Sequence, residues 1–127
     1  MARFELTEDH LKLLQEMFVD FDDSYDEGAP AVGIKRPYGN GDVLGDVAEI
    51  LYGDRRASQD DYIDFNSEGM MKRVTLKDGR VLSESDLRRL HRETATAMQI
   101  VLECQTFETG TYVKTESYTS RGWVRES

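Results

Sequence analysis

Apolar side chains recur at helical spacing in three stretches of the chain. The first runs over about Glu8–Asp20 and begins after Thr7, a residue type favoured as an N-cap. The second lies between Gly41 and Gly53, and the third and longest covers about Glu84–Gln105. Each stretch predicts a helix with one buried face. The residues expected on these faces are Leu11, Leu14, Met17 and Phe18, then Val43, Val47, Ile50 and Leu51, then Leu87, Leu90, Thr94, Ala97, Met98, Val101 and Cys104 or Gln105.

Two further stretches have the pattern of strands. Residues 72–82 alternate around Asp78-Gly79, whose positive φ angles suit a two-residue type I′ turn, and so predict a hairpin. Residues 111–118 are rich in β-branched and aromatic side chains and predict a C-terminal strand, with Trp123-Val124 pairing beside it or closing over the core. A hairpin alone is not an independent sheet, so the C-terminal strand is expected to join it. The predicted fold class is α+β, with three helices packed on a small antiparallel sheet.

Length and charge limit what the protein does. The 127 residues are the size of one domain, residues 1–127. The net charge of −9 disfavours direct binding to nucleic acid or to an anionic membrane. Residues 1–68 hold 17 acidic and 6 basic side chains (−17 + 6 = −11), whereas residues 69–127 hold 8 and 10 (−8 + 10 = +2). This asymmetry predicts self-association or docking onto a basic partner, and a well-solvated surface is the alternative.

The cellular location is predicted from what the sequence lacks. Cys104 is the only cysteine, which excludes an internal disulfide and fits a reducing compartment. No apolar run is long enough to span a membrane, and residues 1–5 do not have the apolar core of a signal peptide. We therefore expect a cytoplasmic protein.

Sequence motifs for metal, cofactor or catalytic sites fail in detail. The acidic stretch Asp20–Glu27 begins like an EF-hand loop, but Tyr25 stands where glycine is needed and Ala31 where the bidentate glutamate is needed. His10 and His91, the only histidines, have no zinc spacing with other ligands. Nucleophile elbows, Walker loops and dinucleotide fingerprints are missing from the sequence. We predict no metal, no cofactor and no catalytic residue, and hence a protein that is not an enzyme.

The strongest candidate for binding is the stretch from Lys35 to Asp42, just before the second predicted helix. Two cations, a ring and two glycines meet at a helix N-terminus, where unpaired backbone N–H groups favour an anion. Phosphate would be held by the cations and a base would stack on the ring. The residues assigned to this site are Lys35, Arg36, Tyr38, Gly39, Asn40 and Gly41. A purely structural interpretation stays open, because proline, glycine and asparagine there also suit a turn and a helix cap.

A second basic group lies on the long predicted helix. It consists of Arg88, Arg89 and Arg92, with further cations on the predicted hairpin at Lys72, Arg73 and Arg80. If the fold or an oligomer brings it close to the first group, the two would share an anionic ligand. The small residues at 94–97 suit a close helix–helix approach, which predicts either a homo-oligomer or a crossing within one chain.

Several segments carry a resemblance to a family. They are Leu6–Leu14, Lys35–Asn40, Asp46–Leu51, Glu93–Leu102 and Phe107–Tyr112. In these segments the chain resembles a group of small proteins encoded by phages and prophages. The resemblance implies an accessory protein acting in the host cytoplasm, where many such proteins antagonise host defence.

The sequence and the resemblance together predict a function and two alternatives. The favoured hypothesis is a phage-type accessory protein that sequesters an anionic small molecule, such as a nucleotide immune signal, without turnover, and so counteracts host defence. The first alternative is an acidic inhibitor that binds a host defence protein, with Phe21 and Tyr25 as aromatic anchors among the carboxylates. The second is a minor structural protein of the virion.

Overall fold

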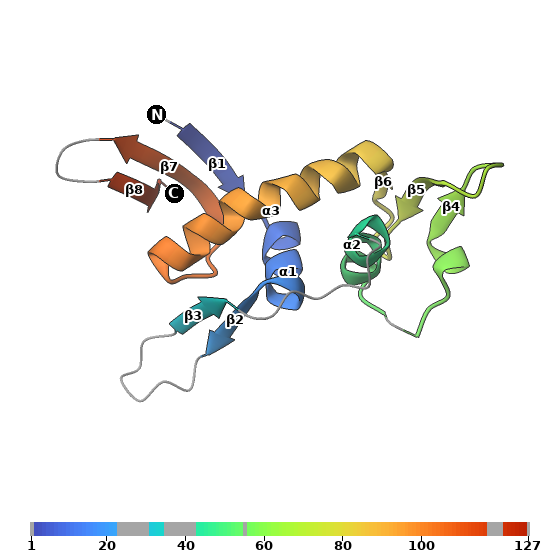
Figure 1. Cartoon of the computed structure of the whole chain (residues 1–127), viewed down its shortest axis with the longest axis horizontal. Coiled ribbons are helices and arrows are strands. Elements are labelled where there is room, and N and C mark those ends of the chain that lie inside the picture. The colour runs from blue at the N-terminus through green and yellow to red at the C-terminus, as the bar shows by residue number, and fades with distance from the viewer. Residues whose placement is uncertain (1, 23–30, 35–42, 55, 117–120, 127) are drawn as a thin grey trace. The chain divides into compact units, whose positions relative to one another are not determined.

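A computed structural model describes residues 2–22, 31–34, 43–54, 56–116 and 121–126. Its contacts divide the chain into two compact units, residues 1–38 with 93–127, and residues 39–92 (Figure 1). The boundary falls inside the longest helix, α3 (Glu84–Cys104). The prediction of a single domain stays a prediction.

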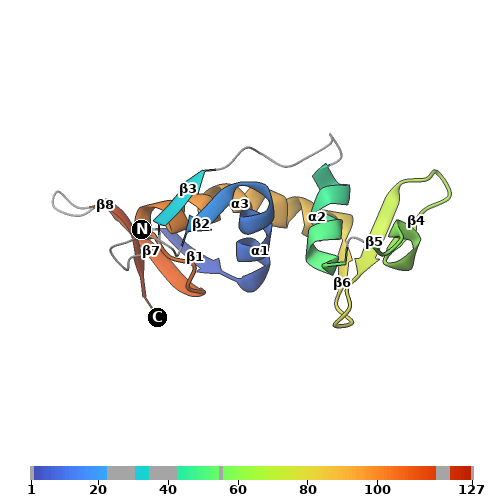
Figure 2. The ribbon, with the colours of Figure 1, turned by 90° about the horizontal axis from the view of Figure 1, so that it is seen from below.

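The first unit is built around a three-stranded antiparallel sheet in the order β1-β7-β8. Its strands are β1 (Ala2–Leu6), β7 (Gly110–Glu116) and β8 (Arg121–Arg125). In Figure 2 these strands lie together beside the orange, C-terminal part of α3. Side chains of the sheet, of α1 (Glu8–Met17) and of α3 form one buried cluster. Its fully packed members are Leu6, Leu11, Leu14, Ala97, Ile100, Val101, Tyr112 and Trp123.

A two-stranded antiparallel sheet completes the first unit. It pairs β2 (Val19–Asp22) with β3 (Ala31–Ile34), so that Val19 lies opposite Ile34. The strand β2 includes Asp20–Asp22, the start of the acidic stretch Asp20–Glu27. The remainder of that stretch falls within residues 23–30, which lie outside the described residues.

The second unit contains α2 (Val43–Tyr52), the 3-10 helix η1 (Gln59–Asp61) and the first turns of α3. Its antiparallel sheet has the order β4-β5-β6, from β4 (Ile63–Phe65), β5 (Met71–Thr75) and β6 (Val81–Ser83). Ile63 lies opposite Val74, and Val74 lies opposite Leu82, so these side chains share one face of the sheet.

Ring contacts link the end of α2 to Tyr62, the residue before β4, and to the loop between β5 and β6. The rings of Tyr52 and Tyr62 stack with 4.4 Å between centroids and 14° between planes. The Nζ atom of Lys77 lies 5.2 Å from the centroid of the Tyr52 ring, a cation–π contact. Burial raises the pKa of the Tyr62 hydroxyl, and the nearby Glu49 charge adds to the effect. The Tyr62 phenol therefore remains neutral at physiological pH.

The predicted α+β class is confirmed, and so are the three α-helices within the described part of the chain. The prediction that the hairpin and the C-terminal strand form one sheet is wrong. The hairpin and the C-terminal strand belong to separate sheets, because β5–β6 pairs with β4 while β7 pairs with β1 and β8. Most residues of the predicted buried faces are buried. Phe18, Met98 and Cys104 are partly buried, and Val43 is 42% exposed. None of the helices in the described part of the chain combines the length and apolarity needed to cross a bilayer.

The turn at Asp78-Gly79 also differs from the prediction. Gly79 has a φ of +91°, but Asp78 does not have the positive φ that a type I′ turn requires. The Gly79 N–H donates to the Leu76 carbonyl at 3.0 Å, and the Leu76 N–H donates to the Arg80 carbonyl at 2.8 Å. This is a three-residue loop in which a type I turn is followed by a left-handed glycine. Asp78 favours it because its carboxylate accepts the Arg80 N–H at 2.9 Å.

Candidate functional site

Of the two predicted basic groups, only the second lies among the residues that the structure describes. Lys35, Arg36, Tyr38, Gly39, Asn40 and Gly41 lie outside the described residues. Arg88, Arg89 and Arg92 lie on α3 within the second unit, and all of them are exposed. Because residues three or four positions apart share a helix face, these guanidinium groups project from one side of α3. We call this surface the arginine face.

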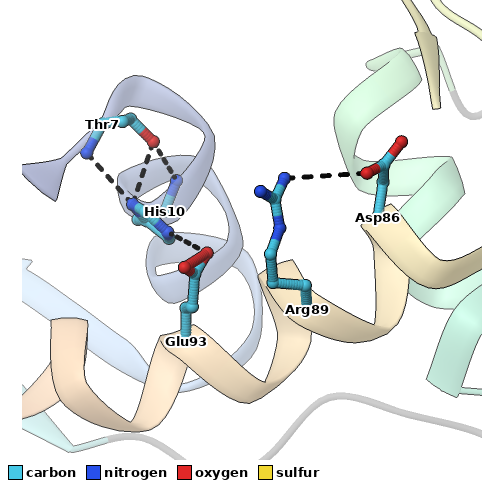
Figure 3. Close-up of polar contacts among 5 residues, drawn as sticks. All are labelled: Thr7, His10, Asp86, Arg89 and Glu93. Atoms are coloured by element: carbon cyan, nitrogen blue, oxygen red, sulfur yellow. Dashed lines mark hydrogen bonds and ion pairs between the residues drawn. The ribbon is translucent and has the colours of Figure 1, made fainter.

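Neighbouring carboxylates orient two members of the arginine face. Arg88 donates from Nη2 and Nε to Glu84 Oε1, one turn earlier, at 2.7 and 2.9 Å. The Nη2 atom of Arg89 lies 3.9 Å from Asp86 Oδ1, as Figure 3 shows. Within the described residues, no carboxylate lies within ion-pair distance of Arg92. The face is therefore partly neutralised by acids of its own helix.

The ion pairs on the arginine face are open to solvent. The side chains of Arg88 and Glu84 are 62% and 41% exposed. Exposed pairs of this kind contribute only about 0–1 kcal/mol to stability, because water screens them. An incoming anion can therefore replace the carboxylates at low cost. Arginine also suits phosphate better than lysine does, since its planar fork donates two parallel hydrogen bonds.

Two of the hairpin cations, Arg73 and Arg80, pair with carboxylates close to them in the chain. The Nε atom of Arg73 lies 2.6 Å from Asp64 Oδ2, and the Nε atom of Arg80 lies 2.9 Å from Asp78 Oδ2. A neighbouring cation, Lys77, also has a partner. Its Nζ atom lies 3.6 Å from Asp54 Oδ2, shortly after the end of α2. The Arg73–Asp64 pair links β5 to β4, and the Arg80–Asp78 pair lies within the turn before β6. These contacts give Arg73 and Arg80 a local structural role.

The start of α2 carries a buried carboxylate that the sequence analysis did not single out. Asp46 lies in the first turn of α2 and is only 4% exposed. A negative charge in the first turn is favourable because it faces the positive end of the helix dipole. The same charge repels a second anion at that helix start. The sequence does show an acidic residue in the first turn of the second predicted helix, which is the feature that could have identified Asp46.

A polar network in the first unit surrounds His10 (Figure 3). The Thr7 backbone N–H donates to His10 Nδ1 at 3.1 Å, and the Thr7 hydroxyl oxygen lies 2.9 Å from the same nitrogen. The His10 N–H in turn meets the Thr7 hydroxyl at 3.4 Å, which completes a capping box with histidine in the position usual for glutamate or glutamine. His10 Nε2 lies 3.2 Å from Glu93 Oε1 on α3.

The His10 network is closed to outside chemistry. The residue is 4% exposed, and both ring nitrogens already have partners within the chain. The ring of Phe4 covers it from β1, with 5.0 Å between centroids. His10 therefore cannot take a proton from a substrate or bind a metal without giving up a contact. A threonine three residues before a histidine, at a predicted helix start, is the sequence signal for this arrangement.

Cys104 lies in a setting that suppresses its reactivity. Burial raises the pKa of its thiol, and the charge of Glu103 raises it further. The thiol donates to the Trp123 carbonyl at 3.3 Å. Reactive cysteines have lowered pKa values and cationic neighbours, so Cys104 acts as a packing residue. Within the described residues, no group of three or more His, Cys, Asp or Glu side chains is placed to hold a metal ion.

Comparison of the chain with protein-family models, with curated proteins and with solved structures found no match.

Proposed function

We propose that the protein binds an anionic small molecule and holds it without chemical change. The observation that carries this proposal is the arginine face: Arg88, Arg89 and Arg92 project together into solvent, and the pairs that two of them make are exposed and weak. A ligand with phosphate groups fits this chemistry, since guanidinium groups bind phosphate through two parallel hydrogen bonds. The cations and ring at 35–38 support the same ligand class from the sequence.

The proposed role in the cell follows from the family resemblance stated above. A phage-type accessory protein that sequesters a nucleotide immune signal in the host cytoplasm would blunt a defence that depends on that signal. Sequestration needs affinity for the signal and no catalytic group.

The test is a calorimetric and thermal-shift screen of linear and cyclic nucleotides, with pyrophosphate as a minimal probe. For a ligand held by the arginine face, Arg88→Ala is expected to weaken binding about tenfold, the loss of about 1.4 kcal/mol of charge-assisted hydrogen bonding. Arg3→Ala is the matched control, because Arg3 is also an exposed arginine in an exposed pair, with Glu126 at 3.0 Å. Recovery of the intact ligand after incubation would support binding without turnover. No binding across the panel would overturn the proposal.

A third variant shows which of the two basic groups holds the ligand. Asp46→Asn removes the buried negative charge from the first turn of α2. If the ligand lies at the start of α2, near Lys35–Gly41, this variant binds more tightly. If the ligand lies on the arginine face, Asp46→Asn leaves the affinity unchanged. The double variant Lys35→Ala with Arg36→Ala also leaves it unchanged.

The acidic inhibitor of a host defence protein remains the second proposal. It rests on the net charge of −11 over residues 1–68. Such binding weakens with added salt, because charge attraction is screened over about 8–10 Å at physiological ionic strength. Charge reversal at Asp22, Asp23 and Asp26 is expected to abolish capture of the partner, and unchanged capture would reject this proposal.

A further inference from the structure

The three-stranded sheet of the first unit has two edges, and α3 covers one of them. That edge is β8. The Trp123 N–H donates to Glu103 Oε2 at 3.0 Å, and the Trp123 carbonyl accepts from the Cys104 thiol at 3.3 Å. Both backbone groups therefore point away from β7. Side chains of α3 thus take the hydrogen bonds that a further strand would need at Trp123.

The contacts of Trp123 also show which way the backbone of β7 faces. Trp123 lies opposite Lys114 in a pair without mutual hydrogen bonds, so the backbone groups of Lys114 point toward β1. The Glu126 N–H donates to the Thr111 carbonyl at 2.7 Å, so the backbone groups of Thr111 point toward β8. Because these directions alternate along a strand, Tyr112 faces β1, as Lys114 does.

The other edge of the sheet is β1, dark blue in Figure 1. Ala2 and Phe4 lie opposite the two β7 residues that face β1, so they form hydrogen bonds with β7. Arg3 and Glu5 alternate with them, so their backbone N–H and C=O groups point out of the sheet edge. Within the described part of the chain, no further backbone hydrogen bond involves Arg3 or Glu5, and both residues are exposed. The edge at β1 is therefore open to another strand.

We infer that the open edge of β1 pairs with the same edge of a second copy of the chain. Antiparallel pairing about a two-fold axis at Phe4 places Arg3 of each copy opposite Glu5 of the other. Both residues direct their backbone groups outward, so each pair exchanges main-chain hydrogen bonds in both directions. Their side chains lie on the same face of the joined sheet and carry opposite charges, which stabilises directly opposed residues.

Charge and backbone direction select this register over its neighbours. An axis at Arg3 would place Arg3 opposite Arg3, and an axis at Glu5 would place Glu5 opposite Glu5. Like charges directly opposite destabilise a pair of strands. A register shifted by one residue would set outward backbone groups against inward ones. The axis at Phe4 instead brings the two Phe4 rings together on the face that packs against the helices, where each ring is only partly buried.

The charges of β1 have exposed contacts within one copy. Arg3 pairs with Glu126 at 3.0 Å, and Glu5 accepts from the Thr111 hydroxyl at 2.6 Å. Because these contacts are open to solvent, exchanging them for contacts with a second copy costs little. The inference goes beyond the proposed ligand and does not depend on it, because β1 belongs to the first unit and the arginine face to the second.

Sedimentation of the full chain over about 1 µM to about 1 mM tests the pairing. We expect a monomer that becomes a dimer as the concentration rises. Arg3→Glu and Glu5→Arg each turn both attractive pairs into repulsive ones, so each variant is expected to raise the dissociation constant about tenfold or more. Glu126→Gln is the matched control. It removes a charge beside Arg3 that belongs to neither intermolecular pair, and it is expected not to weaken the dimer.

An equimolar mixture of the two charge-reversal variants separates lost pairing from lost folding. In a mixed dimer the acidic residues of one copy lie opposite the arginines of the other, so the mixture is expected to associate about as tightly as the wild type. A misfolded variant could not do this. Amide hydrogen exchange locates the contact. Protection at Arg3 and Glu5 is expected to rise with the fraction of dimer, whereas the Phe4 amide, bonded to β7, is protected in both states.

Three results would overturn the inference. The first is a monomeric mass at every concentration, which would leave the edge free for a strand of another protein. The second is a dimer whose affinity is unchanged in Arg3→Glu, or a mixture of the two variants that fails to associate. The third is a dimer in which the amides of Arg3 and Glu5 exchange as fast as in the monomer, because the contact would then lie elsewhere.

Discussion

Gly122 in β8 is a position where a single methyl group should destabilise the first unit. Its φ of +141° lies in a region that residues with a side chain rarely adopt. A Cβ added there would lie 3.0 Å from Glu103 Oε2. That oxygen accepts the Trp123 N–H at 3.0 Å, so moving it away weakens a hydrogen bond between α3 and β8. Gly122→Ala therefore combines backbone strain with the displacement of a carboxylate.

The two contributions have separate magnitudes. Holding alanine in such a conformation costs about 1–3 kcal/mol. Loss of the carboxylate hydrogen bond adds about 1 kcal/mol, less than for a buried charge because Glu103 is exposed. We expect Gly122→Ala to lower the free energy of unfolding by about 2–4 kcal/mol in total. Urea unfolding followed by the fluorescence of Trp123, the single tryptophan, measures it in the unit concerned.

A double-mutant cycle separates strain from displacement. In a Glu103→Ala background the added Cβ meets no carboxylate, so the cost that remains for Gly122→Ala is the backbone strain of about 1–3 kcal/mol. If the whole cost disappears in that background, the backbone carries no strain and the reasoning from φ is refuted. A cost below about 0.5 kcal/mol in the wild-type background would refute both contributions.

Two further predictions concern ionisable groups. The raised pKa of Cys104 predicts slower alkylation by iodoacetamide in the native protein than in urea at the same pH, and equal rates would contradict the assigned burial. The Arg80 backbone N–H lowers the pKa of Asp78, so the native carboxyl binds a proton less readily than the unfolded one. Its stabilising effect is full above the unfolded pKa and is lost as the pH falls through the folded pKa. Asp78→Asn should therefore flatten the acid side of the stability curve below about pH 4, and an unchanged curve would contradict this.

Local patterns predicted the helices well because each helix is specified by residues close together in the sequence. α3 was expected over Glu84–Gln105 and runs over Glu84–Cys104. Gln105 ends it with a left-handed φ of +49°, and the Thr106 N–H donates to the Val101 carbonyl at 3.3 Å. A non-glycine residue in this position is uncommon, so the sequence does not signal the ending strongly.

Sheet partners were predicted less well because pairing joins distant parts of the chain. β1 was not predicted, although Phe4 and Leu6 alternate with Arg3 and Glu5 in the manner of a strand. Its partner is β7, more than a hundred residues later, and no local pattern identifies that partner. The hairpin was predicted at the correct place, but its third strand is β4, which precedes it directly.

The assignment of binding residues stays a prediction, but the position of the second basic group on its helix could be predicted from the sequence. The spacing of Arg88, Arg89 and Arg92 within a strongly periodic helix was enough to place them on one exposed face. The spacing of Glu84 and Asp86 relative to them was equally visible, but whether a carboxylate pairs depends on side-chain geometry. The burial of Asp46 depends on tertiary packing, which the sequence pattern does not give.

The polar networks of the two units differ in what they can do, and exposure accounts for the difference. The Arg88–Glu84 pair lies in solvent, where exchanging one anion for another costs little, so this surface can take a ligand. The His10 network is buried, where every donor and acceptor must keep a partner, so an exchange of partners there costs more. Binding of an anion is therefore expected at the first network and not at the second.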